Sequence, residues 1–438
     1  MKLEEVDYLC RVGPGTPMGE TFRRYWIPAL LAKDVAEPDG APVALTLLGE
    51  RLVAFRDTEG KLGVIDELCA HRGVSLTTAR NDGCGLRCIY HGWKYDVEGR
   101  IVDTPNMAPG STFKDRNRVK SYPAREAGGL IWVYMGPHEE EPPFPHYSWF
   151  DVDPQYVDIS ETLMECNYLQ VQEGSIDSSH VSVLHHGMLS KPATADPKVL
   201  AADGGMIRFG GWVGQEPLDG SPVDNAPTDD MAPTFEIENT EFGFHYAAIR
   251  RSLYGSDQRY VRVTAFTFPY ISFIPPTGLI TITVPLDDYR CTFIGVLITE
   301  ADKSGAMKAR RAQDAAKPDL GREGRVFVPP VQDRAAMKAG TSFSGYYGVT
   351  IEDAAVQMAM GQYPDRENEH LVSPADAAVL RFRLLLRQEA ARVAKGERAK
   401  FAWPTLDTSK IEAGSGIVPD DIPWRDLVPG NQSHQVTD

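Results

Sequence analysis

Long uninterrupted apolar runs are missing from this 438-residue chain, and cysteine is scarce. The most apolar stretch, near residues 271–285, is broken by Pro275 and Pro276 and therefore predicts no membrane-spanning helix. The six cysteines, at positions 10, 69, 84, 88, 166 and 291, are too scattered for the disulfide framework of a small secreted protein. Residues 1–7 are acidic and lack an apolar signal core. We therefore expect a cytoplasmic protein with no membrane partner.

An excess of positive charge is also missing. The chain has 45 Lys and Arg residues against 61 Asp and Glu residues, which gives a formal net charge of −16. Because nucleic acid is a dense polyanion, this charge argues against nucleic acid as a partner. The glycines of the loop at 11–19 do not match G-x-G-x-x-G, and no βαβ unit is expected after them, so we interpret this loop as a packing turn.

Short strand-like segments dominate the first third of the chain, which predicts a small antiparallel β domain. These segments are residues 43–48, 52–55, 62–65 and 130–134. The proline-rich, acidic stretch 136–145 marks a domain boundary.

The remainder combines strands with helices, which is typical of an α+β fold. Strands are expected at 206–213, 234–240, 243–250, 259–274, 278–285 and 289–298. We expect helices over 165–190 and after Ser373, where Pro374 and Asp376 complete a helix-start signal. The tail after Trp403 is expected to lie over the surface.

The clearest metal-binding pattern runs from Cys69 to His91. One arm is C-x-H, with Cys69 and His71, and the other is C-x-x-H, with Cys88 and His91. Two thiolates and two imidazoles suit a tetrahedral zinc ion, or a [2Fe–2S] cluster with the cysteines on one iron and the histidines on the other. Zinc arms usually pair like ligands, whereas one Cys and one His in each arm is the Rieske arrangement, which we favour.

A second group of ligand-type residues lies in the expected helix at 165–190. Asp177 and His180 are three residues apart and would share a helix face. His180 and His185 are separated by about 500° around a regular helix, so binding one metal would require a helix end or an irregular turn between them. The alternative is an ordinary helix with surface histidines.

Two histidines need a carboxylate to complete the facial triad that leaves positions open on Fe(II). Our candidate is Asp353, which begins an expected apolar helix whose face could line a pocket. Acids at helix N-termini more often only compensate the helix dipole, and Glu352 fits either role.

Together these motifs resemble the oxygenase (alpha) component of Rieske non-haem iron oxygenases. The matching patterns are C-x-H-R-G, C-x-x-H-G-W and D-x-x-H-x-x-x-x-H, the last at Asp177, His180 and His185. Three further stretches resemble the phthalate dioxygenase subgroup, namely 11–19, 22–26 and 351–361. The resemblance covers nearly the whole chain.

The resemblance implies a small antiparallel β Rieske domain and a larger catalytic domain whose antiparallel sheet is covered by helices in a helix-grip-like arrangement. The expected limits are 1–24 for an N-terminal helix and loop, 25–140 for the Rieske domain and 141–438 for the catalytic domain. The implied [2Fe–2S] ligands are Cys69, His71, Cys88 and His91. The implied ligands of mononuclear Fe(II) are His180, His185 and Asp353.

The resemblance also implies electron transfer between neighbouring subunits of a trimer, or of a hexamer made of stacked trimers. Asp177 would be the bridge, because its carboxylate would accept hydrogen bonds from His180 and from the partner subunit's His91. Asn167 resembles the nearby non-ligand asparagine of the family. The sequence contains no nicotinamide or flavin fingerprint, so the electrons would come from a separate flavin-containing, NADH-dependent reductase.

Members of the phthalate dioxygenase subgroup act on aromatic carboxylates, by ring dihydroxylation or by O-demethylation. A buried substrate carboxylate needs a guanidinium partner, and Arg208 and Arg250 are our candidates. In an alternating strand only one of Arg250 and Arg251 can point inward. Two other hypotheses stay open: a Rieske electron-transfer protein, and a zinc-stapled binding module, which would be colourless.

Overall fold

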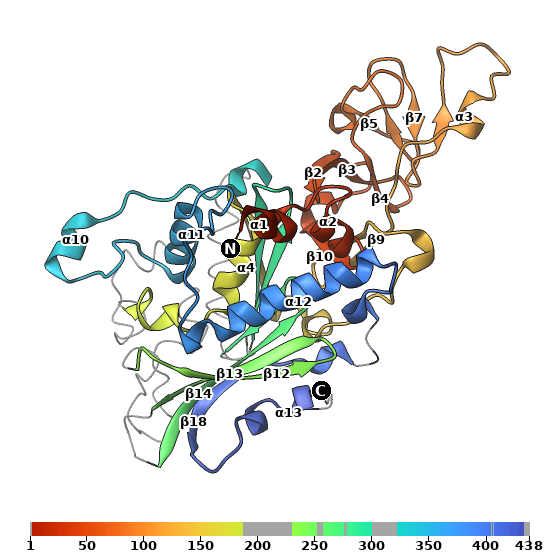
Figure 1. Cartoon of the computed structure of the whole chain (residues 1–438). Helices are drawn as coiled ribbons and strands as arrows, with labels where there is room; N and C mark the ends of the chain where they lie inside the picture. Colours follow the sequence, from red (N-terminus) through yellow and green to blue (C-terminus); the bar gives the residue numbers. More distant parts are fainter. Residues whose placement is uncertain are drawn as a thin grey trace.

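The computed structural model describes residues 2–186, 230–251, 257–275, 278–299, 322–403, 405 and 407–432. Figure 1 shows a small β-rich domain at one end of the molecule and a larger domain of sheet and helices at the other. None of the helices in these ranges is both long enough and apolar enough to cross a lipid bilayer.

The small domain contains three antiparallel sheets. Its strands are β1 (Trp26–Leu31), β2 (Val43–Leu47), β3 (Glu50–Arg56), β4 (Leu62–Asp66), β5 (Arg80–Asn81), β6 (Leu86–Arg87), β7 (Lys94–Tyr95), β8 (Ile101–Asp103), β9 (Ala124–Ala127) and β10 (Leu130–Tyr134). They pair in the orders β1-β10-β9, β2-β3-β4 and β5-β6-β7-β8. The four strands expected here are confirmed as β2, β3, β4 and β10. Because β1 pairs with β10, this domain extends at least to Tyr134; the exact limits of all three domains stay a prediction.

The larger domain is built on one eight-stranded antiparallel sheet. Its strands are β11 (Val157–Met164), β12 (Thr234–Thr240), β13 (Gly243–Arg251), β14 (Gln258–Thr267), β15 (Ile271–Ile274), β16 (Leu279–Pro285), β17 (Cys291–Ile298) and β18 (Gly414–Pro419). The order is β11-β17-β16-β15-β14-β13-β12, and β18 pairs with β14.

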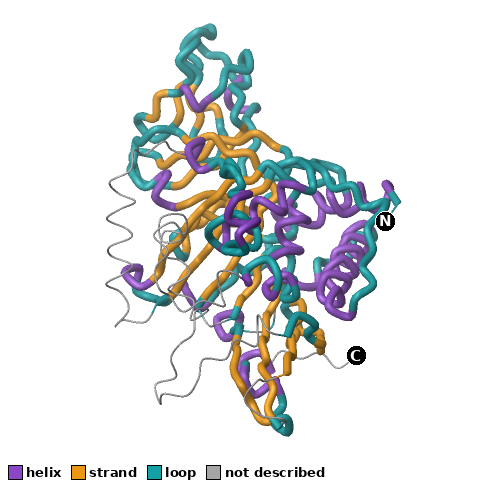
Figure 2. The backbone as a smooth tube through the Cα atoms, turned by 90° about the vertical axis from the view of Figure 1, so that its left-hand side faces the viewer, coloured by secondary structure: helices purple, strands orange, loops and turns teal. Residues whose placement is uncertain are grey.

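The helices account for most of the remaining regular structure. They are α1 (Leu3–Cys10), α2 (Pro17–Phe22), α3 (Phe113–Arg116), α4 (Tyr168–Ile176), α10 (Arg334–Ala339), α11 (Val349–Ala359), α12 (Ala377–Ala394) and α13 (Pro429–Gln432). α3 lies in the small domain (Figure 1), whereas most of the others lie beside the strands of the larger domain when the molecule is viewed from the side (Figure 2). The helix-start signal at Ser373 is confirmed, since its hydroxyl and the Asp376 carboxylate form a capping box just before α12.

Two of these helices cover the same face of the large sheet. Gln172 of α4 donates a hydrogen bond to Ser272 over 2.8 Å, and Phe382 of α12 packs edge-on against Phe266. Phe266 and Ser272 are partners in the register of β14 and β15, so their side chains point to one face. α4 and α12 therefore pack on the same face of the sheet, which confirms the expected α+β architecture with helices that cover the sheet.

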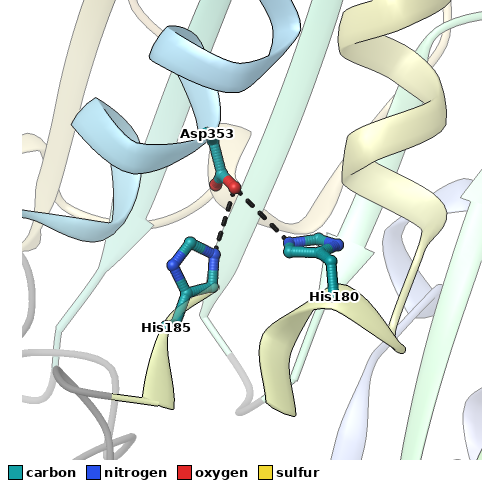
Figure 3. Close-up of side chains that lie close together, drawn as sticks. All are labelled: His180, His185 and Asp353. Carbon is teal, nitrogen blue, oxygen red and sulfur yellow. Dashed lines mark ion pairs between the residues drawn. The ribbon is translucent and has the colours of Figure 1, made fainter. Parts of the chain in front are cut away.

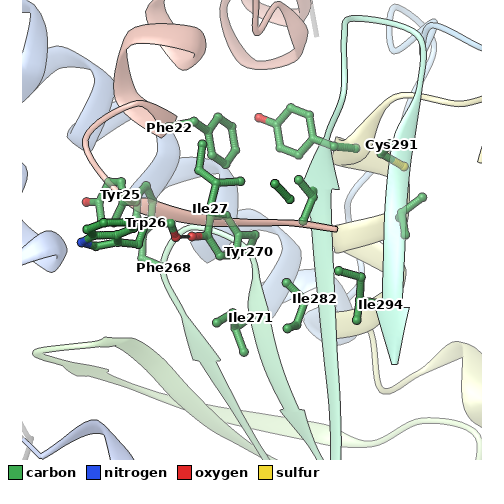
Figure 4. Packing of buried hydrophobic residues seen from close by; sticks show 14 of the residues in the cluster. Phe22, Tyr25, Trp26, Ile27, Phe268, Tyr270, Ile271, Ile282, Cys291 and Ile294 are labelled. Atoms are coloured by element: carbon green, nitrogen blue, oxygen red, sulfur yellow. Dashed lines mark hydrogen bonds between the residues drawn. The ribbon is translucent and has the colours of Figure 1, made fainter. Parts of the chain in front are cut away.

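The two domains share a continuous apolar core. Figure 4 shows Phe22, Trp26 and Ile27 packed against residues of the larger domain, among them Tyr270 in the turn after β14 and Ile282 of β16. The Tyr270 hydroxyl donates a hydrogen bond to the Trp26 carbonyl across this junction. The small domain is therefore fixed on the sheet by buried contacts as well as by the connecting chain.

Several expectations about the larger domain were wrong in detail. The strand expected over 259–274 is two strands, β14 and β15, with a turn containing the Phe268–Pro269 peptide between them. Of the helix expected over 165–190, the described residues form α4, then an irregular segment with a 3₁₀ turn over His180–Ser182, and residues 187–190 lie outside the described residues. The tail does not only cover the surface, because β18 adds a strand to the sheet. The strand expected over 206–213 lies outside the described residues.

Candidate metal centres and substrate cavity

The two Cys/His arms fold into matching loops at the tip of the small domain. In the first loop the N–H of Gly73 donates to the carbonyl of Cys69 over 2.8 Å, and in the second the N–H of Gly92 donates to the carbonyl of Cys88 over 3.0 Å. Both glycines adopt positive φ, +69° and +77°, a conformation that glycine reaches without steric cost. A Cβ on Gly92 would also lie 2.7 Å from Cγ of Pro105. The glycine after each arm is therefore required by the turn.

These loops bring the four predicted cluster ligands together. The rings of His71 and His91 have their centroids 4.4 Å apart. The His71 Nδ1 atom is buried and has no hydrogen-bond partner. Burial raises the pKa of the Cys88 thiol, and the adjacent Cys69 thiol raises it further. Backbone hydrogen bonds to Cys88 lower this pKa, but they do not outweigh the other two effects. A bound cation reverses this balance by stabilising thiolates, so the donor set fits a metal cluster better than four free side chains.

The second site is formed where α4 ends. Asp177 has an extended conformation at the C-terminus of this helix, and a 3₁₀ turn over His180–Ser182 follows. The N–H of Leu184 donates to the His180 carbonyl over 2.8 Å, which turns the chain back toward the cavity. Asp177 and His180 therefore do not share a regular helix face. The irregular turn that the spacing required between His180 and His185 is present.

This turn directs both histidines toward Asp353 of α11 (Figure 3). Asp353 Oδ1 lies 3.4 Å from His180 Nε2 and 3.1 Å from His185 Nε2. One ligand atom from each of the three residues lies within 4.8 Å of the others. His185 Nε2 is buried and makes no well-aligned hydrogen bond despite its proximity to Asp353. Lone pairs that converge on a common point, with open space beside them, fit the facial triad of a non-haem iron site.

The charges of the group also favour a bound cation. Burial alone would raise the pKa of Asp353, but His185 and His180 hold it well below its ordinary value. Burial alone would lower the pKa of His180, but Asp177 and Asp353 raise it to about 10. The two carboxylates therefore hold a proton on His180 when no metal is bound, and a metal ion would replace that proton.

Asp177 contacts His180 at the ring nitrogen that faces away from Asp353. Its Oδ2 lies 3.4 Å from His180 Nδ1, and its Oδ1 accepts two hydrogen bonds from Ser179 at 2.7 Å. Burial opposes ionisation, but His180 and Ser179 outweigh it and lower the pKa of Asp177 to about 2. The carboxylate is therefore charged at neutral pH.

A cavity of about 140 Å³ opens directly beside the triad. Its floor is one face of the sheet, where Thr264 of β14 pairs with Tyr246 of β13 and the neighbouring Ile274 pairs with Leu279 of β16. Because alternate residues of each strand share a face, the same side also presents Arg262 to the cavity. Most of the lining is apolar, and the triad forms part of its opposite wall.

Asn167 and Arg250 are not among the described residues that line this cavity. Asn167 caps α4, with Oδ1 accepting from the Leu169 N–H and Nδ2 donating to the carbonyls of Cys10 and Asp288. Because its side-chain oxygen and nitrogen are bonded in this way, Asn167 supports the start of α4. Arg208 lies outside the described residues.

Arg250 points inward while Arg251 is exposed, as alternation requires, but Arg250 does not line the cavity among the described residues. Its guanidinium donates to the carbonyls of Asp230 and Ser178 and to the Ser182 hydroxyl, so it fixes the turn that carries His180. Arg262 was missed in the sequence. The sequence did contain a signal for this arginine. Arg262 stands between the apolar residues Val261 and Val263, so in a strand its side chain lies on the face of the sheet opposite to theirs.

These two sites define a two-domain metalloprotein with an iron–sulfur centre and a separate mononuclear centre. Comparison with known families agrees. A family model described as a Rieske [2Fe-2S] domain matches residues 25–123, and a model described as LigXa C-terminal domain like matches residues 133–208 and 221–437.

Two curated proteins are similar over nearly their whole lengths. The phthalate 4,5-dioxygenase oxygenase subunit of Pseudomonas putida is 36% identical over 437 residues, which cover 97% of this chain and 94% of that protein. The 3-chlorobenzoate-3,4-dioxygenase oxygenase subunit of Comamonas testosteroni is 35% identical over 441 residues, with 95% and 93% covered. The fold resembles a solved oxygenase–ferredoxin complex of carbazole 1,9a-dioxygenase, with a TM-score of 0.54, 18% identity, and 86% of this chain and 90% of that chain covered.

The chain belongs to the Rieske non-haem iron oxygenases, as an oxygenase (alpha) subunit. Its cofactors are a Rieske [2Fe–2S] cluster and mononuclear iron, as expected. Membership argues against both the zinc-stapled binding module and the electron-transfer protein without oxygenase activity.

Replacement of the triad carboxylate should remove one metal and spare the other. We expect Asp353→Ala to lower the iron content from about three to about two atoms per chain. About two acid-labile sulfides should be retained, because the four ligands of the cluster are unchanged. The measurement is iron and sulfide analysis with a visible spectrum. The exposed Asp365→Ala variant, on the loop after α11, is the control. Unchanged iron in Asp353→Ala would assign the ligand role to another acid.

Replacement of the predicted bridge should spare both metals. We expect Asp177→Asn to keep wild-type iron and sulfide but to lose turnover by about 100-fold or more, because the charge beside His180 is removed while every ligand remains. Steady-state oxygenation with a native reductase is the measurement. Wild-type turnover would show that electrons do not pass through this carboxylate.

Proposed function

We propose that this subunit oxygenates a single-ring aromatic carboxylate, with dioxygen as co-substrate and electrons from a separate flavin-containing, NADH-dependent reductase. The observation that carries the proposal is a single cavity that combines the candidate iron triad, apolar walls and one buried arginine. The relatives named for phthalate and 3-chlorobenzoate support the same substrate class, since both are aromatic carboxylates.

The size of the cavity suits one aromatic ring. Its volume of about 140 Å³ is close to the roughly 150 Å³ of an engineered apolar cavity that binds benzene. Apolar side chains such as Ile274, Leu279 and Phe293 contribute walls against which a ring can pack. A ring held there lies beside His180, His185 and Asp353, so the reaction would be directed by how deeply the ring enters.

Arg262 is well placed to bind the carboxylate of such a substrate. Of the cavity-lining residues that the structure describes, it alone carries a permanent positive charge. Arg262 is only 3% exposed, and this burial lowers the pKa of its guanidinium. Its guanidinium donates a hydrogen bond to the Pro275 carbonyl at 3.2 Å. A buried guanidinium forms strong, directional hydrogen bonds with a carboxylate and would offset the cost of burying that anion.

Each part of the site has a role in this proposal. Cys69, His71, Cys88 and His91 would hold the cluster. His180, His185 and Asp353 would hold Fe(II), which supplies an open coordination site for dioxygen activation. The apolar walls exclude water from the ring, and Arg262 fixes the orientation of the acid. The same triad serves ring hydroxylation and O-demethylation, and the position of the ring would select between them.

Electron delivery would require a second copy of the chain. The loops that carry the Cys/His arms lie with β5 and β7 at the tip of the small domain, whereas α4 and α11 lie well away from this tip (Figure 1). We therefore propose a trimer, or stacked trimers, in which the tip of one subunit approaches Asp177 of the next. The resemblance to an oxygenase–ferredoxin complex supports a separate protein as the electron donor.

Removal of the cavity arginine should weaken acid binding selectively. We expect Arg262→Gln to raise the dissociation constant of a benzoate-type substrate by about 30-fold or more, because loss of a buried charge partner costs at least about 2 kcal/mol. The corresponding methyl ester lacks the anion and should be affected much less. Substrate-dependent oxygen uptake and ligand binding are the measurements. Arg251→Gln, on the exposed side of β13, is the control.

Equal losses for the acid and the ester would exclude Arg262 as the carboxylate partner. Absence of aromatic-acid-dependent oxygen uptake in the wild-type protein, loaded with both metals and supplied with reductase, would contradict the proposed function itself.

Transfer between subunits can be tested by complementation. Cys69→Ser subunits should lack the cluster, and Asp353→Ala subunits should lack mononuclear iron, so neither homo-oligomer should turn over. Mixed oligomers from co-expression should regain measurable activity, because an intact cluster and an intact iron site then face each other across an interface. Mixed oligomers that stay inactive, despite verified mixing by mass spectrometry, would indicate transfer within one subunit.

A further inference from the structure

The residue before the proposed iron ligand is a second buried carboxylate. Glu352 lies in α11 directly before Asp353 and is only 2% exposed. Its Oε2 lies 2.8 Å from His185 Nδ1, and its Oε1 accepts a 2.5 Å hydrogen bond from the Ser344 hydroxyl. Burial of a carboxylate is expensive unless its oxygens are bonded, and here both are.

Helix geometry separates the roles of the two neighbouring acids. Successive residues of an α-helix point about 100° apart, so Asp353 and Glu352 cannot face the same side. Asp353 lines the cavity, whereas Glu352 is not among the described residues that do. Glu352 instead reaches behind the ring of His185, on the side away from Nε2.

The two histidines are supported in the same way. His180 has a carboxylate at Nδ1, that of Asp177 at 3.4 Å, and His185 has one at Nδ1, that of Glu352 at 2.8 Å. A carboxylate accepts only, so a hydrogen bond from Nδ1–H leaves the lone pair of the neutral ring on Nε2. In both rings Nε2 is the atom that faces Asp353.

The Glu352 carboxylate is itself held in place from outside α11. The Ser344 hydroxyl that donates to it also accepts from the Tyr346 N–H at 3.1 Å, and the Gln332 side chain donates to the Ser344 carbonyl at 2.6 Å. These bonds order the segment before α11. The carboxylate therefore has little freedom to rotate away from His185.

We propose that Glu352 is a positioning residue, which sets the tautomer and ring orientation of His185 so that Nε2 is ready to bind iron, with Ser344 fixing the Glu352 carboxylate. The inference rests on the proposed iron site formed by His180, His185 and Asp353. It extends that site by a charged group that never touches the metal. Such outer partners typically contribute 10- to 100-fold to metal affinity or activity.

The test compares graded variants of this contact in the full-length protein with its cluster assembled. Glu352→Gln keeps an acceptor for His185 but loses the charge, Glu352→Met loses both, and Ser344→Ala removes only the support of the carboxylate. Glu389→Gln is the matched control. Glu389 lies in α12, is equally buried at 2% exposure, and accepts hydrogen bonds from the Tyr25 hydroxyl and the Lys400 N–H.

We expect the dissociation constant of Fe(II) at the mononuclear site to rise by about 10- to 100-fold in Glu352→Gln and further in Glu352→Met. Ser344→Ala should give a smaller rise. The electron paramagnetic resonance spectrum of the Fe(II)–nitric oxide adduct should change in each, since it reports ligand orientation. The cluster spectrum should stay as in the wild type. If Glu352→Met fails to fold, Glu352→Gln and Ser344→Ala still decide the question.

Three outcomes would overturn the inference. Wild-type iron affinity and an unchanged adduct spectrum in Glu352→Gln would remove Glu352 from the site while leaving the proposed function intact. Loss of iron in Glu352→Gln, with iron retained in Asp353→Asn, would make Glu352 the ligand. Equal changes in Glu389→Gln would indicate general destabilisation. Failure of the wild-type protein to bind mononuclear iron would instead contradict the proposed function.

Discussion

The larger domain depends on the approach of Asp353 to two histidines that lie far earlier in the chain. The two segments meet because α4 and α11 are fastened together inside the protein. The Gln170 side chain donates to the carbonyls of Gln357 and Gly361, at 2.9 and 3.0 Å. An added Cβ on Gly174 would lie 2.3 Å from the Gln357 amide, so a larger residue there would force the Gln357 side chain to move. Any change in the spacing of these helices would separate the triad.

A buried ion-pair network strengthens the same junction. Glu173 of α4 pairs with Arg366 at 2.7 Å and with Arg383 of α12 at 2.6 Å, and both arginines also pair with Glu369. Loss of one partner from such a network would leave an unpaired buried charge, which typically costs several kcal/mol. The network therefore joins α4 to α12 and to the segment that follows α11.

Motifs with local spacing could be predicted from the sequence, and contacts between distant segments could not. The two arms from Cys69 to His91 were identifiable because each fits within one short loop. Asp353 needed the family resemblance, since nothing local distinguishes it from Glu352. Arg262 was overlooked because its meaning depends on which face of β14 is covered. Asn167 caps α4, and a capping side chain has the same sequence appearance as a polar site residue, so its predicted role at the site stays a prediction.

Several buried polar atoms at the cavity of the larger domain have no hydrogen-bond partner. The side-chain atoms Ser178 Oγ, Thr281 Oγ1 and His185 Nε2 are buried without a hydrogen-bond partner, and all three residues line the cavity. Each such atom costs roughly 1–3 kcal/mol. A cavity shaped only for packing would place apolar groups there, so their positions indicate sites that a metal, a water molecule or a polar substrate group would satisfy. A ligand that binds in this cavity would then stabilise the fold. The junction of α4 and α11 would keep these polar atoms in place before the ligand binds.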